Sequence, residues 1–522
     1  MNKNLFSTKK TAAAADTVNA AGGRAYSVSD EAALAQYAVT GTLNGVYYAS
    51  AEAQLQEVLK LADRCSPRFV AQTAVYARTR GFMKDVPALL VAHVATRDLD
   101  LFKAVFPVVI DDFKMLRNFV QVVRSGVTGR KSLGTALKTQ VKKFLESRTD
   151  DEIFAGSIGN DPSLADIIRM VHPTPKTVSR ANLYAYLLGR TFKIKLLPDQ
   201  ARGFELFKNN PSGHPPEVNF QLLSNISMSK DQWAALAQTM SWHTLRMNLN
   251  TLNRNKVFDI KGMDTVVANR LRDPESIRKL KLFPYQLLAA YMNAVDVPVQ
   301  VRNALQDAME LATKNVPEFP GRTVVAVDTS GSMGSPITGN RGSVSTTIRC
   351  VDVAGLIAAT ILRRNGDALI MPFDTRVHGA GSVNARDSIV TNAEKLARFG
   401  GGGTDCASVL RKLNQDKTKA DLVFYVSDNE SWVQSSGRYA SYYGSGAGTD
   451  MAGEWLIFRR RCPGAKLICL DLVPNSTVQV RTGDDVLNIG GFSDKVFEVV
   501  ASFCRGDFGT DTFVKTVKDI EI

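Results

Sequence analysis

Cysteine and histidine are scarce in this sequence, with six cysteines and five histidines among 522 residues. No two cysteines form a Cys-x-x-Cys pair, and no cysteines and histidines have the spacing of a zinc site. Several cysteines lie within apolar runs, where a thiol is usually a small core residue. The sequence therefore predicts free thiols and an intracellular, reducing environment, which we take to be the cytoplasm.

Long apolar segments are also lacking. No run of about 18 apolar residues is present, so we expect neither a membrane-spanning helix nor a membrane partner. Residues 1–24 contain lysines and alanines but no continuous apolar stretch of the kind found in signal peptides. We expect this segment to be a flexible N-terminal arm.

Acidic residues are outnumbered in one part of the chain only. Residues 1–320 contain 41 Lys and Arg against 29 Asp and Glu, a net charge of +12. Residues 321–522 contain 23 against 22, a net charge of +1. The excess positive charge thus lies in the N-terminal part, which predicts a polyanionic partner for that part.

The pattern from about residue 28 to residue 316 is helical throughout. The stretch "SPRFVAQTAVYARTRG" is typical, because Ser66 is a candidate N-cap, Pro67 suits the first helical position and Gly81 can end the helix. Many short amphipathic helices with tight breaks predict stacked helical hairpins. No exact period is present, so the array would be degenerate, of the HEAT type. A compact irregular helical domain is the alternative.

The spacing of apolar residues changes at "NVPEFPGR" (residues 315–322), which we interpret as a domain boundary. After it, apolar strands such as "RTVVAVD", "DALIMPFD", "DLVFYVSD" and "AKLICLDLV" alternate with amphipathic helices. This alternation predicts a mostly parallel, Rossmann-like sheet that is covered on both faces. The expected fold is multidomain, with an all-α helical-repeat domain over residues 25–318 and an α/β domain over residues 319–522.

Oxygen-bearing side chains gather at the ends of the predicted strands. In "VVAVDTSGSMGS", Asp328, Ser330 and Ser332 alternate along an extended segment and therefore point the same way. Thr404 follows a run of glycines, and Asp428 directly follows a buried strand. Since ligands bind outside the carboxyl ends of the strands in open α/β sheets, we expect these side chains to meet there. Two carboxylates and three hydroxyls suit Mg²⁺, and Mn²⁺ would fit as well. A simple turn is the alternative.

The same motifs lack a catalytic base. Only His378 falls close to them in the sequence, and no Ser-His or Cys-His arrangement is evident. The stretch "TSGSMG" does not meet the Gly-x-Ser-x-Gly pattern of a nucleophile elbow. We expect a protein that is not an enzyme, and a Mg²⁺-dependent hydrolase is the weaker alternative.

The motifs of the α/β part resemble those of a known module. "AVDTSGSM", "GGGTDCAS" and "FYVSDNESW" resemble the metal-ion-dependent adhesion site of a von Willebrand factor A module. The segments "LNGVYYASAEAQL", "SGVTGRKSLGTALK", "IIRMVHPTP", "WAALAQTMSWHTLRMNLNTL" and "LFPYQLLAAY" resemble a TROVE module. A TROVE module before an A module is the arrangement of the Ro ribonucleoprotein family, and the sequence resembles its bacterial-type members over residues 25–522.

This resemblance implies a monomeric ring of HEAT-like helices that the A module closes. It implies binding of Y-like small noncoding RNAs on the outside of the ring, and of single-stranded 3′ ends of misfolded RNAs through its hole. DNA is not an expected ligand. The implied role is RNA quality control or decay, in which bacterial relatives can work with exoribonucleases. The five oxygen-bearing residues above match the metal ligands of the A module.

Two basic clusters are candidate RNA contacts by the same resemblance. The first lies in "RSGVTGRKSLGTALKTQVKKF" and comprises Arg124, Arg130, Lys131, Lys138 and Lys142. The second lies in "HPTPKTVSR" and comprises His172, Lys176 and Arg180. Solvated helix faces are the alternative for each single residue, whereas the group favours RNA.

One tyrosine-rich stretch, "WVQSSGRYASYYGSGAG", departs from the family pattern. Its residues Arg438, Tyr439, Tyr442 and Tyr443 could stack on bases or contact a partner, and a surface loop without function is the alternative. For the whole chain, the second hypothesis is a metal-dependent protein–protein adhesion module that uses the helical part as a scaffold.

Overall fold

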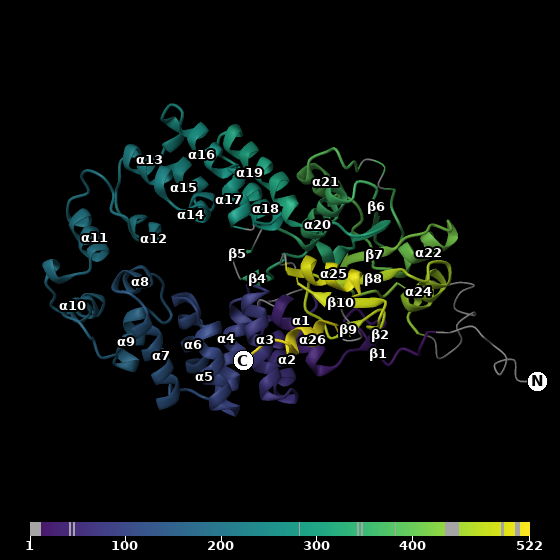
Figure 1. Cartoon of the computed structure of the whole chain (residues 1–522), viewed down its shortest axis with the longest axis horizontal. Coiled ribbons are helices and arrows are strands. Elements are labelled where there is room, and N and C mark those ends of the chain that lie inside the picture. The colour runs from purple at the N-terminus through teal and green to yellow at the C-terminus, as the bar shows by residue number, and fades with distance from the viewer. Residues whose placement is uncertain are drawn as a thin grey trace, which may run out of the picture.

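The computed structural model describes residues 12–40, 43–44, 47–280, 282–341, 344–345, 348–379, 381, 383–433, 448–491, 495–506 and 512–522. Within these ranges the chain forms a helical region and an α/β region, which lie on the left and on the right of Figure 1. The prediction of helical repeats followed by an α/β unit is confirmed.

The helical region is built of short helices joined by tight turns. Within the described ranges, no helix combines the length and the apolar character that a bilayer crossing requires. In chain order the helices are α1 (Asp30–Thr40), α2 (Ala51–Arg64), α3 (Pro67–Thr79), α4 (Asp85–Arg97), α5 (Leu99–Val109), α6 (Phe113–Ser125), α7 (Thr135–Ser147), α8 (Asp150–Ala155), α9 (Leu164–Val171), α10 (Val178–Leu187), α11 (Asp199–Asn209), α12 (Phe220–Leu223), α13 (Lys230–Thr239), α14 (Trp242–Met247), α15 (Leu249–Arg254), α16 (Met263–Leu271), α17 (Pro274–Lys279), α18 (Pro284–Asn293) and α19 (Val299–Ala312).

Capping side chains set where these helices begin. As predicted, Ser66 is the N-cap of α3, where its hydroxyl accepts a hydrogen bond from the backbone N–H of Phe69 at 3.2 Å, and Pro67 is the first helical residue. Thr149 and Glu152 form a capping box at the start of α8. Each cap satisfies N–H groups that have no partner within the helix, and such a cap contributes about 1 kcal/mol.

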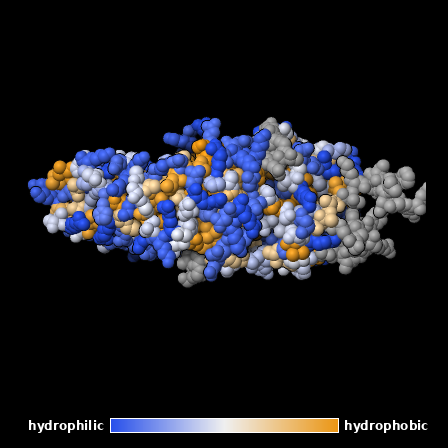
Figure 2. Space-filling model, turned by 90° about the horizontal axis from the view of Figure 1, so that it is seen from below, coloured by the Kyte–Doolittle hydropathy of each residue, from blue (hydrophilic) through white to orange (hydrophobic). Residues whose placement is uncertain are grey.

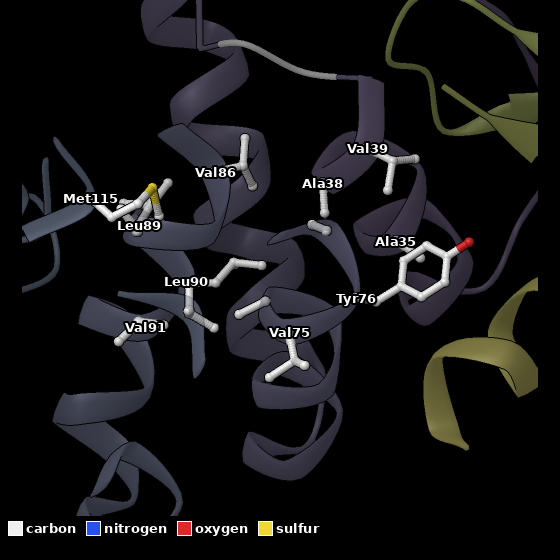
Figure 3. Packing of buried hydrophobic residues seen from close by; sticks show 14 of the residues in the cluster. Ala35, Ala38, Val39, Val75, Tyr76, Val86, Leu89, Leu90, Val91 and Met115 are labelled. Atoms are coloured by element: carbon white, nitrogen blue, oxygen red, sulfur yellow. The ribbon is translucent and has the colours of Figure 1, made fainter. Parts of the chain in front are cut away.

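The helices pack against one another around α4. Residues 86–95 of this helix are all buried, and all of them except His93 are apolar, so the helix lies inside the stack. Figure 3 shows Leu90 of α4 on the side of Val75 of α3, and Leu89 beside Met115 of α6. Burial of α4 on all sides explains why its sequence, "DVPALLVAHVATR", shows no polar face.

The α/β region contains a five-stranded parallel sheet with helices on both faces. The spatial order of its strands is β10-β8-β7-β3-β6. These strands are β3 (Thr323–Asp328), β6 (Leu369–Phe373), β7 (Leu422–Ser427), β8 (Lys466–Asp471) and β10 (Val486–Gly490). The smaller strands are β1 (Thr17–Val18), β2 (Arg24–Ser27), β4 (Asn340–Arg341), β5 (Val344–Ser345) and β9 (Thr477–Val478). The helices are α20 (Cys350–Arg364), α21 (Ile389–Leu396), α22 (Ala407–Gln415), α24 (Asp450–Arg461), α25 (Lys495–Arg505) and α26 (Thr512–Lys518).

Alternate residues of the strands face opposite layers. On β3, Val325 and Val327 belong to the hydrophobic core that includes α20, whereas Val324 and Ala326 belong to the core that includes α22 and α24. This alternation follows from the two-residue repeat of an extended strand. Because both faces of the sheet are buried, the sequence of β3 is a continuous apolar run, as expected for a strand of a covered parallel sheet.

The helical region begins and ends against the α/β region. At one end α1 contacts β10 and α26, and at the other end α18 contacts α20 and α19 contacts α21. The core of α13–α19 includes Leu356 and Ala359 of α20 and Ile389 of α21. The helices thus follow one another round a ring that the α/β region closes (Figure 1). Figure 2, seen from below, shows a flattened body whose visible face is mostly hydrophilic.

Residues 12–24 differ from the prediction of a flexible arm. Strand β1 pairs antiparallel with β2, and β2 pairs antiparallel with β9 of the α/β region. Tyr26 on β2 is buried, and its hydroxyl donates a hydrogen bond to the carbonyl of Ala13 at 2.7 Å. The turn between β1 and β2 requires Gly23, because a Cβ there would lie 2.0 Å from the carbonyl oxygen of Ser431. The predicted boundary after residue 24 therefore falls inside β2, and residues 1–11 lie outside the described part of the chain.

All six cysteines are free thiols, as predicted, and Cys65, Cys350, Cys406 and Cys469 are buried. Burial raises the pKa of the Cys65 thiol to about 12, with a smaller contribution from nearby Glu31 and Asp30. A thiol with a raised pKa is a poor nucleophile and a poor metal ligand, because both roles need the thiolate. The described thiols thus belong to the packing of the protein.

Candidate metal centre and nucleic-acid interface

The predicted metal ligands lie where the chain reverses direction across the sheet. β3 has the next sheet strand along the chain, β6, on one side and the following one, β7, on the other. Since α20, which follows β3, and α24, which follows β7, cover opposite faces, the chain leaves the two strands in different directions and a crevice lies between the loops. Asp328 is the last residue of β3, and Asp428 directly follows β7. Both carboxylates therefore stand at this crevice.

Backbone hydrogen bonds hold the glycine-rich loop against the loop after β3. The N–H of Gly401 donates to the carbonyl of Thr329 at 2.8 Å, and the N–H of Gly331 donates to the carbonyl of Gly402 at 2.9 Å. Gly400 has a φ of +76°, and a Cβ there would lie 2.2 Å from the carbonyl oxygen of Thr329. The close approach of the two loops therefore depends on glycine at this position.

Thr404 connects the glycine-rich loop to the loop after β7. Its carbonyl accepts hydrogen bonds from the N–H groups of Trp432 and Val433 at 3.1 and 3.0 Å. Thr404 itself is 1% exposed. The structure thus brings together the three loops that carry the five predicted ligands.

Asp328 is fully buried and bound on both carboxylate oxygens. Oδ1 accepts a hydrogen bond from the N–H of Ser330 at 2.9 Å, and Oδ2 accepts one from the hydroxyl of Ser427 at 2.5 Å. Burial and the neighbouring charge of Asp428 raise the pKa of Asp328 to about 7, although these hydrogen bonds act in the opposite direction. Two carboxylates held in one dry crevice therefore need a compensating positive charge. Sequence reasoning missed Ser427, whose signal is its place directly before Asp428.

Asp428 is buried as well, and burial raises its pKa. Hydrogen bonds from Ser332 and from the N–H of Glu430 oppose this shift. The hydroxyls of Ser330 and Ser332 lie 3.2 Å apart. The hydroxyl of Ser332 thereby links the loop after β3 to the carboxylate that follows β7.

The donors at this crevice are all oxygen atoms, which is the set that a hard divalent cation takes. The two carboxylates would compensate the charge of a divalent ion, and neutral hydroxyls would supply further ligands. Across the described ranges, no group of three or more His, Cys, Asp and Glu side chains has a geometry that could hold a metal. The residues therefore fit a cation that completes its coordination with water or with an anionic group from outside.

A cavity of about 260 Å³ opens on Ser332 and Asp428. Its walls include Tyr47 and Tyr48 from the segment before α2, and Asn19 from the turn between β1 and β2. The helical region and the N-terminal strands therefore line the approach to a site that lies in the α/β region. Sequence reasoning missed this contribution, for which the adjacent tyrosines in "LNGVYY" were the available signal.

Glu430 adds a third buried carboxyl group beside the cavity. Burial, and to a smaller extent the charge of Asp428, raise its pKa to about 7. Its Oε2 accepts a hydrogen bond from the N–H of Ala21 at 3.2 Å, and Asn19 Nδ2 donates to the carbonyl of Ser431 at 2.8 Å. These bonds fix the N-terminal segment at the rim of the crevice.

The first basic cluster lies on and beside the turn between α6 and α7. Arg124 is exposed in the last turn of α6, Arg130 and Lys131 lie in the connecting loop, and Lys138 and Lys142 share a face of α7. None of these five side chains makes an ion pair or a hydrogen bond within the described part of the chain. Their charge is therefore available to an anion such as phosphate. We call these five residues the α6–α7 basic surface.

At Arg180 the structure differs from the predicted role. Its guanidinium donates to the carbonyls of Leu145 and Arg148 at 3.1 and 2.6 Å and pairs with Asp150, and its side chain is 14% exposed. It thus binds carbonyls at the end of α7, where the last carbonyls of a helix need donors from outside its regular hydrogen bonds. We assign Arg180 to the packing of α10 on α7 and α8.

The other two members of the second basic cluster are exposed. His172 follows α9 in a left-handed conformation with φ of +50°. Lys176 Nζ pairs with Glu146 Oε2 of α7 at 3.0 Å. Because an exposed pair of this kind contributes little, Lys176 can exchange its partner for a phosphate. The pair also shows that the second cluster adjoins α7. Arg438, Tyr439, Tyr442 and Tyr443 lie outside the described residues.

Comparison with known proteins gives a consistent picture. Residues 322–441 match the family model described as "Ro60 vWA domain". A protein of Deinococcus radiodurans named "RNA-binding protein RO60" is 24% identical over 538 aligned residues, which cover 94% of this chain and 95% of that protein. The crystal structure of the Deinococcus radiodurans RO (RSR) protein matches with a TM-score of 0.62 and 20% identity, over 92% of this chain and 100% of that one. The structural match shows a shared fold that includes the helical region.

Proposed function

We propose that the chain is a member of the Ro ribonucleoprotein family and that it binds RNA through its helical region. The observation that carries the proposal is the net charge of +12 on residues 1–320, against +1 on the rest of the chain. Phosphate contacts supply a large share of protein–nucleic acid affinity, so the region with unpaired positive charge is the region expected to hold RNA. The name of the Deinococcus relative supports the same ligand class.

We place the RNA on the α6–α7 basic surface, with His172 and Lys176 beside it. The ligands that we propose are Y-like noncoding RNA and misfolded RNA with single-stranded 3′ ends, which would enter the ring because only an unpaired strand is thin enough. We further propose that the protein acts as a monomer in the cytoplasm, in RNA quality control or decay, with an exoribonuclease as a candidate partner. Neither DNA nor a catalytic activity forms part of the proposal.

We also propose that the crevice between β3 and β7 holds Mg²⁺, and Mn²⁺ would fit the same donors. Asp328 and Asp428 would compensate the charge of the ion, and Ser330, Ser332 and Thr404 would contribute hydroxyl oxygens. Such an ion would offer its remaining positions to an anionic group of a partner. Metal-dependent protein adhesion as the function of the whole chain is not favoured, because the full-length relative is named for RNA binding.

The test of RNA binding is a filter-binding titration with the full chain across a range of salt concentrations. A protein that neutralises phosphates loses affinity linearly on a logarithmic scale, whereas a flat response would contradict the proposal. Replacing Lys138 and Lys142 with Glu should lower the salt slope by about two, since each lysine neutralises about one phosphate. The matched control replaces Lys412 and Lys419, which are exposed in the α/β region, with Glu. It should leave the RNA affinity and the salt slope unchanged.

A further inference from the structure

A cavity of about 400 Å³ lies in the helical region, away from both sites described above. Residues of α12 and of the loop that follows it, Trp233 of α13, and residues from the end of α14 to the end of α15 form its walls. Figure 1 shows α12 and α14 on the inner side of the ring. A cavity of this volume falls in the range of sites for small molecules.

The apolar wall of the cavity contains two aromatic rings. Phe220 and Trp233 lie edge to face, with ring centroids 5.4 Å apart and planes at 62°. Ile226 and Met228 extend this wall. A flat π-system can pack on such a wall, and every nucleobase has one.

Trp233 also carries an unused hydrogen-bond donor. This residue is 3% exposed, and its indole N–H has no hydrogen-bond partner in the part of the chain that the structure describes. The other two buried tryptophans do have partners, because Trp242 donates to the carbonyl of Leu271 and Trp455 donates to Asp485. Among the described residues, the buried polar side-chain atoms that lack a partner do not include this indole nitrogen, so its N–H reaches open space and can donate to a ligand acceptor.

Two asparagines supply acceptors whose orientation is fixed. Asn248 Nδ2 donates to the carbonyl of Thr244, and Asn255 Nδ2 donates to the carbonyl of Thr251, each at 2.8 Å. Because each amide nitrogen is bound to a carbonyl oxygen, the amide oxygen is the free end of each side chain. Both asparagines line the cavity, which therefore offers acceptors to a ligand that carries an amino group.

The charge of the cavity suits an anion. No Asp or Glu lines it, and Arg254 is exposed at its wall. The guanidinium of Arg254 is bound on one side only, by Nη2 to the hydroxyl of Thr251 at 3.2 Å. Its remaining N–H groups can bind a phosphate that lies at the mouth of the cavity.

We propose that this cavity binds one unpaired nucleotide of an RNA strand, and that it prefers a base with an exocyclic amino group, such as adenine or cytosine, over uracil, which is the one RNA base without such a group. The inference rests on the proposed RNA-binding function. The base packs on Phe220 and Trp233, its amino group donates to the oxygens of Asn248 and Asn255, and its phosphate contacts Arg254. Uracil presents a carbonyl oxygen where adenine and cytosine present the amino group, which leaves the amide oxygens of the half-buried Asn248 and Asn255 facing another acceptor.

The test measures fluorescence anisotropy of labelled single-stranded oligo(A), oligo(C) and oligo(U) of equal length with the full chain at one salt concentration. Oligo(A) and oligo(C) should bind about tenfold more tightly than oligo(U), because one satisfied contact of this kind discriminates by about that factor. Asn248→Ala and Asn255→Ala should each reduce this preference. Asn253→Ala is the matched control, because the amide of Asn253 donates to the carbonyl of Asp296 and the residue does not line the cavity.

Trp233→Phe provides a second variant, since it keeps an aromatic ring and removes the N–H. Thermal melting would verify that each variant is folded. If Trp233→Phe does not fold, the two asparagine variants still test the proposal. An unchanged preference in both asparagine variants, with salt-dependent binding intact, would overturn the nucleotide site and leave the proposed function standing. Absence of any RNA binding by the unaltered protein would overturn both.

Discussion

The helical and α/β regions of this protein use charge in opposite ways. In the helical region the excess charge is positive and exposed, and on the α6–α7 basic surface it lacks partners within the described chain. In the α/β region the charges nearly balance, and the key carboxylates, Asp328 and Asp428, are buried within one crevice. Dispersed exposed charge suits a long polyanion, whereas concentrated buried charge suits one small cation.

The two regions are nevertheless joined through buried polar contacts. Gln36 of α1 donates through Nε2 to Oδ2 of Asp471, the last residue of β8, at 2.8 Å. Asn475 donates to the same oxygen and to the carbonyl of Asp428, both at 3.3 Å. The first helix of the ring is thus connected, through two residues, to the backbone of a predicted metal ligand. The two regions thus differ in the charges that they present, but they are physically connected.

The largest effect that would test this contrast concerns RNA affinity. Replacing Lys131, Lys138 and Lys142 together with Glu should weaken RNA binding by about 1000-fold at low salt, because three attractions become three repulsions. Filter binding measures this change, and circular dichroism should show an unchanged helix content. If affinity fell by less than about tenfold, the α6–α7 basic surface would not be the principal RNA contact.

At Arg180 we expect a substitution to change the stability of the protein and not its RNA affinity. Arg180→Ala should lower the free energy of unfolding by about 2–3 kcal/mol, because it removes the ion pair of the half-buried Asp150 and two hydrogen bonds to the carbonyls of Leu145 and Arg148. RNA affinity, measured well below the melting temperature, should not change. Lys176→Ala is the control, and it should leave stability unchanged because its pair with Glu146 is exposed. A stable Arg180→Ala variant with impaired RNA binding would restore the role predicted from the sequence.

Some features of these sites could be predicted from the sequence, and others could not. The sequence predicted that the loops carrying the five proposed metal ligands come together, because strand ends in a parallel sheet have a fixed geometric meaning. The intramolecular partners of Arg180 were not foreseen, because a basic residue near a proline-rich turn has the same sequence signature whether it binds phosphate or the end of a helix. The role of residues 12–24 was also hidden, since β1 and β2 are too short for an alternating pattern. Their pairing with β9 joins segments about 450 residues apart, which local rules do not address.

Magnesium should act on the α/β region alone. Addition of Mg²⁺ should raise the free energy of unfolding by about 2.7 kcal/mol once its free concentration is about 100 times the dissociation constant. Differential scanning calorimetry would detect this as a higher melting temperature. Asp328→Asn should remove the response while the protein stays folded, because it also removes one of two neighbouring buried charges. A response that survives this substitution would place the ion elsewhere.

The smallest expected effect is a pH dependence that belongs to the helical region. His93 is buried in α4, and burial lowers its pKa below 6.5, although Asp63 lies 3.5 Å away and acts in the opposite direction. A histidine whose pKa is lower in the folded state stabilises the fold above the unfolded pKa. That stability is lost as the pH falls from about 6.5 through the folded value. Denaturant unfolding at a series of pH values should therefore show that the unaltered protein loses stability relative to the His93→Gln variant over this interval. The acids of the α/β crevice bind protons more tightly when folded, so their contribution rises as the pH falls. If the unaltered protein instead gained stability relative to His93→Gln as the pH falls, the assignment of a neutral His93 to the core of the helical region would fail.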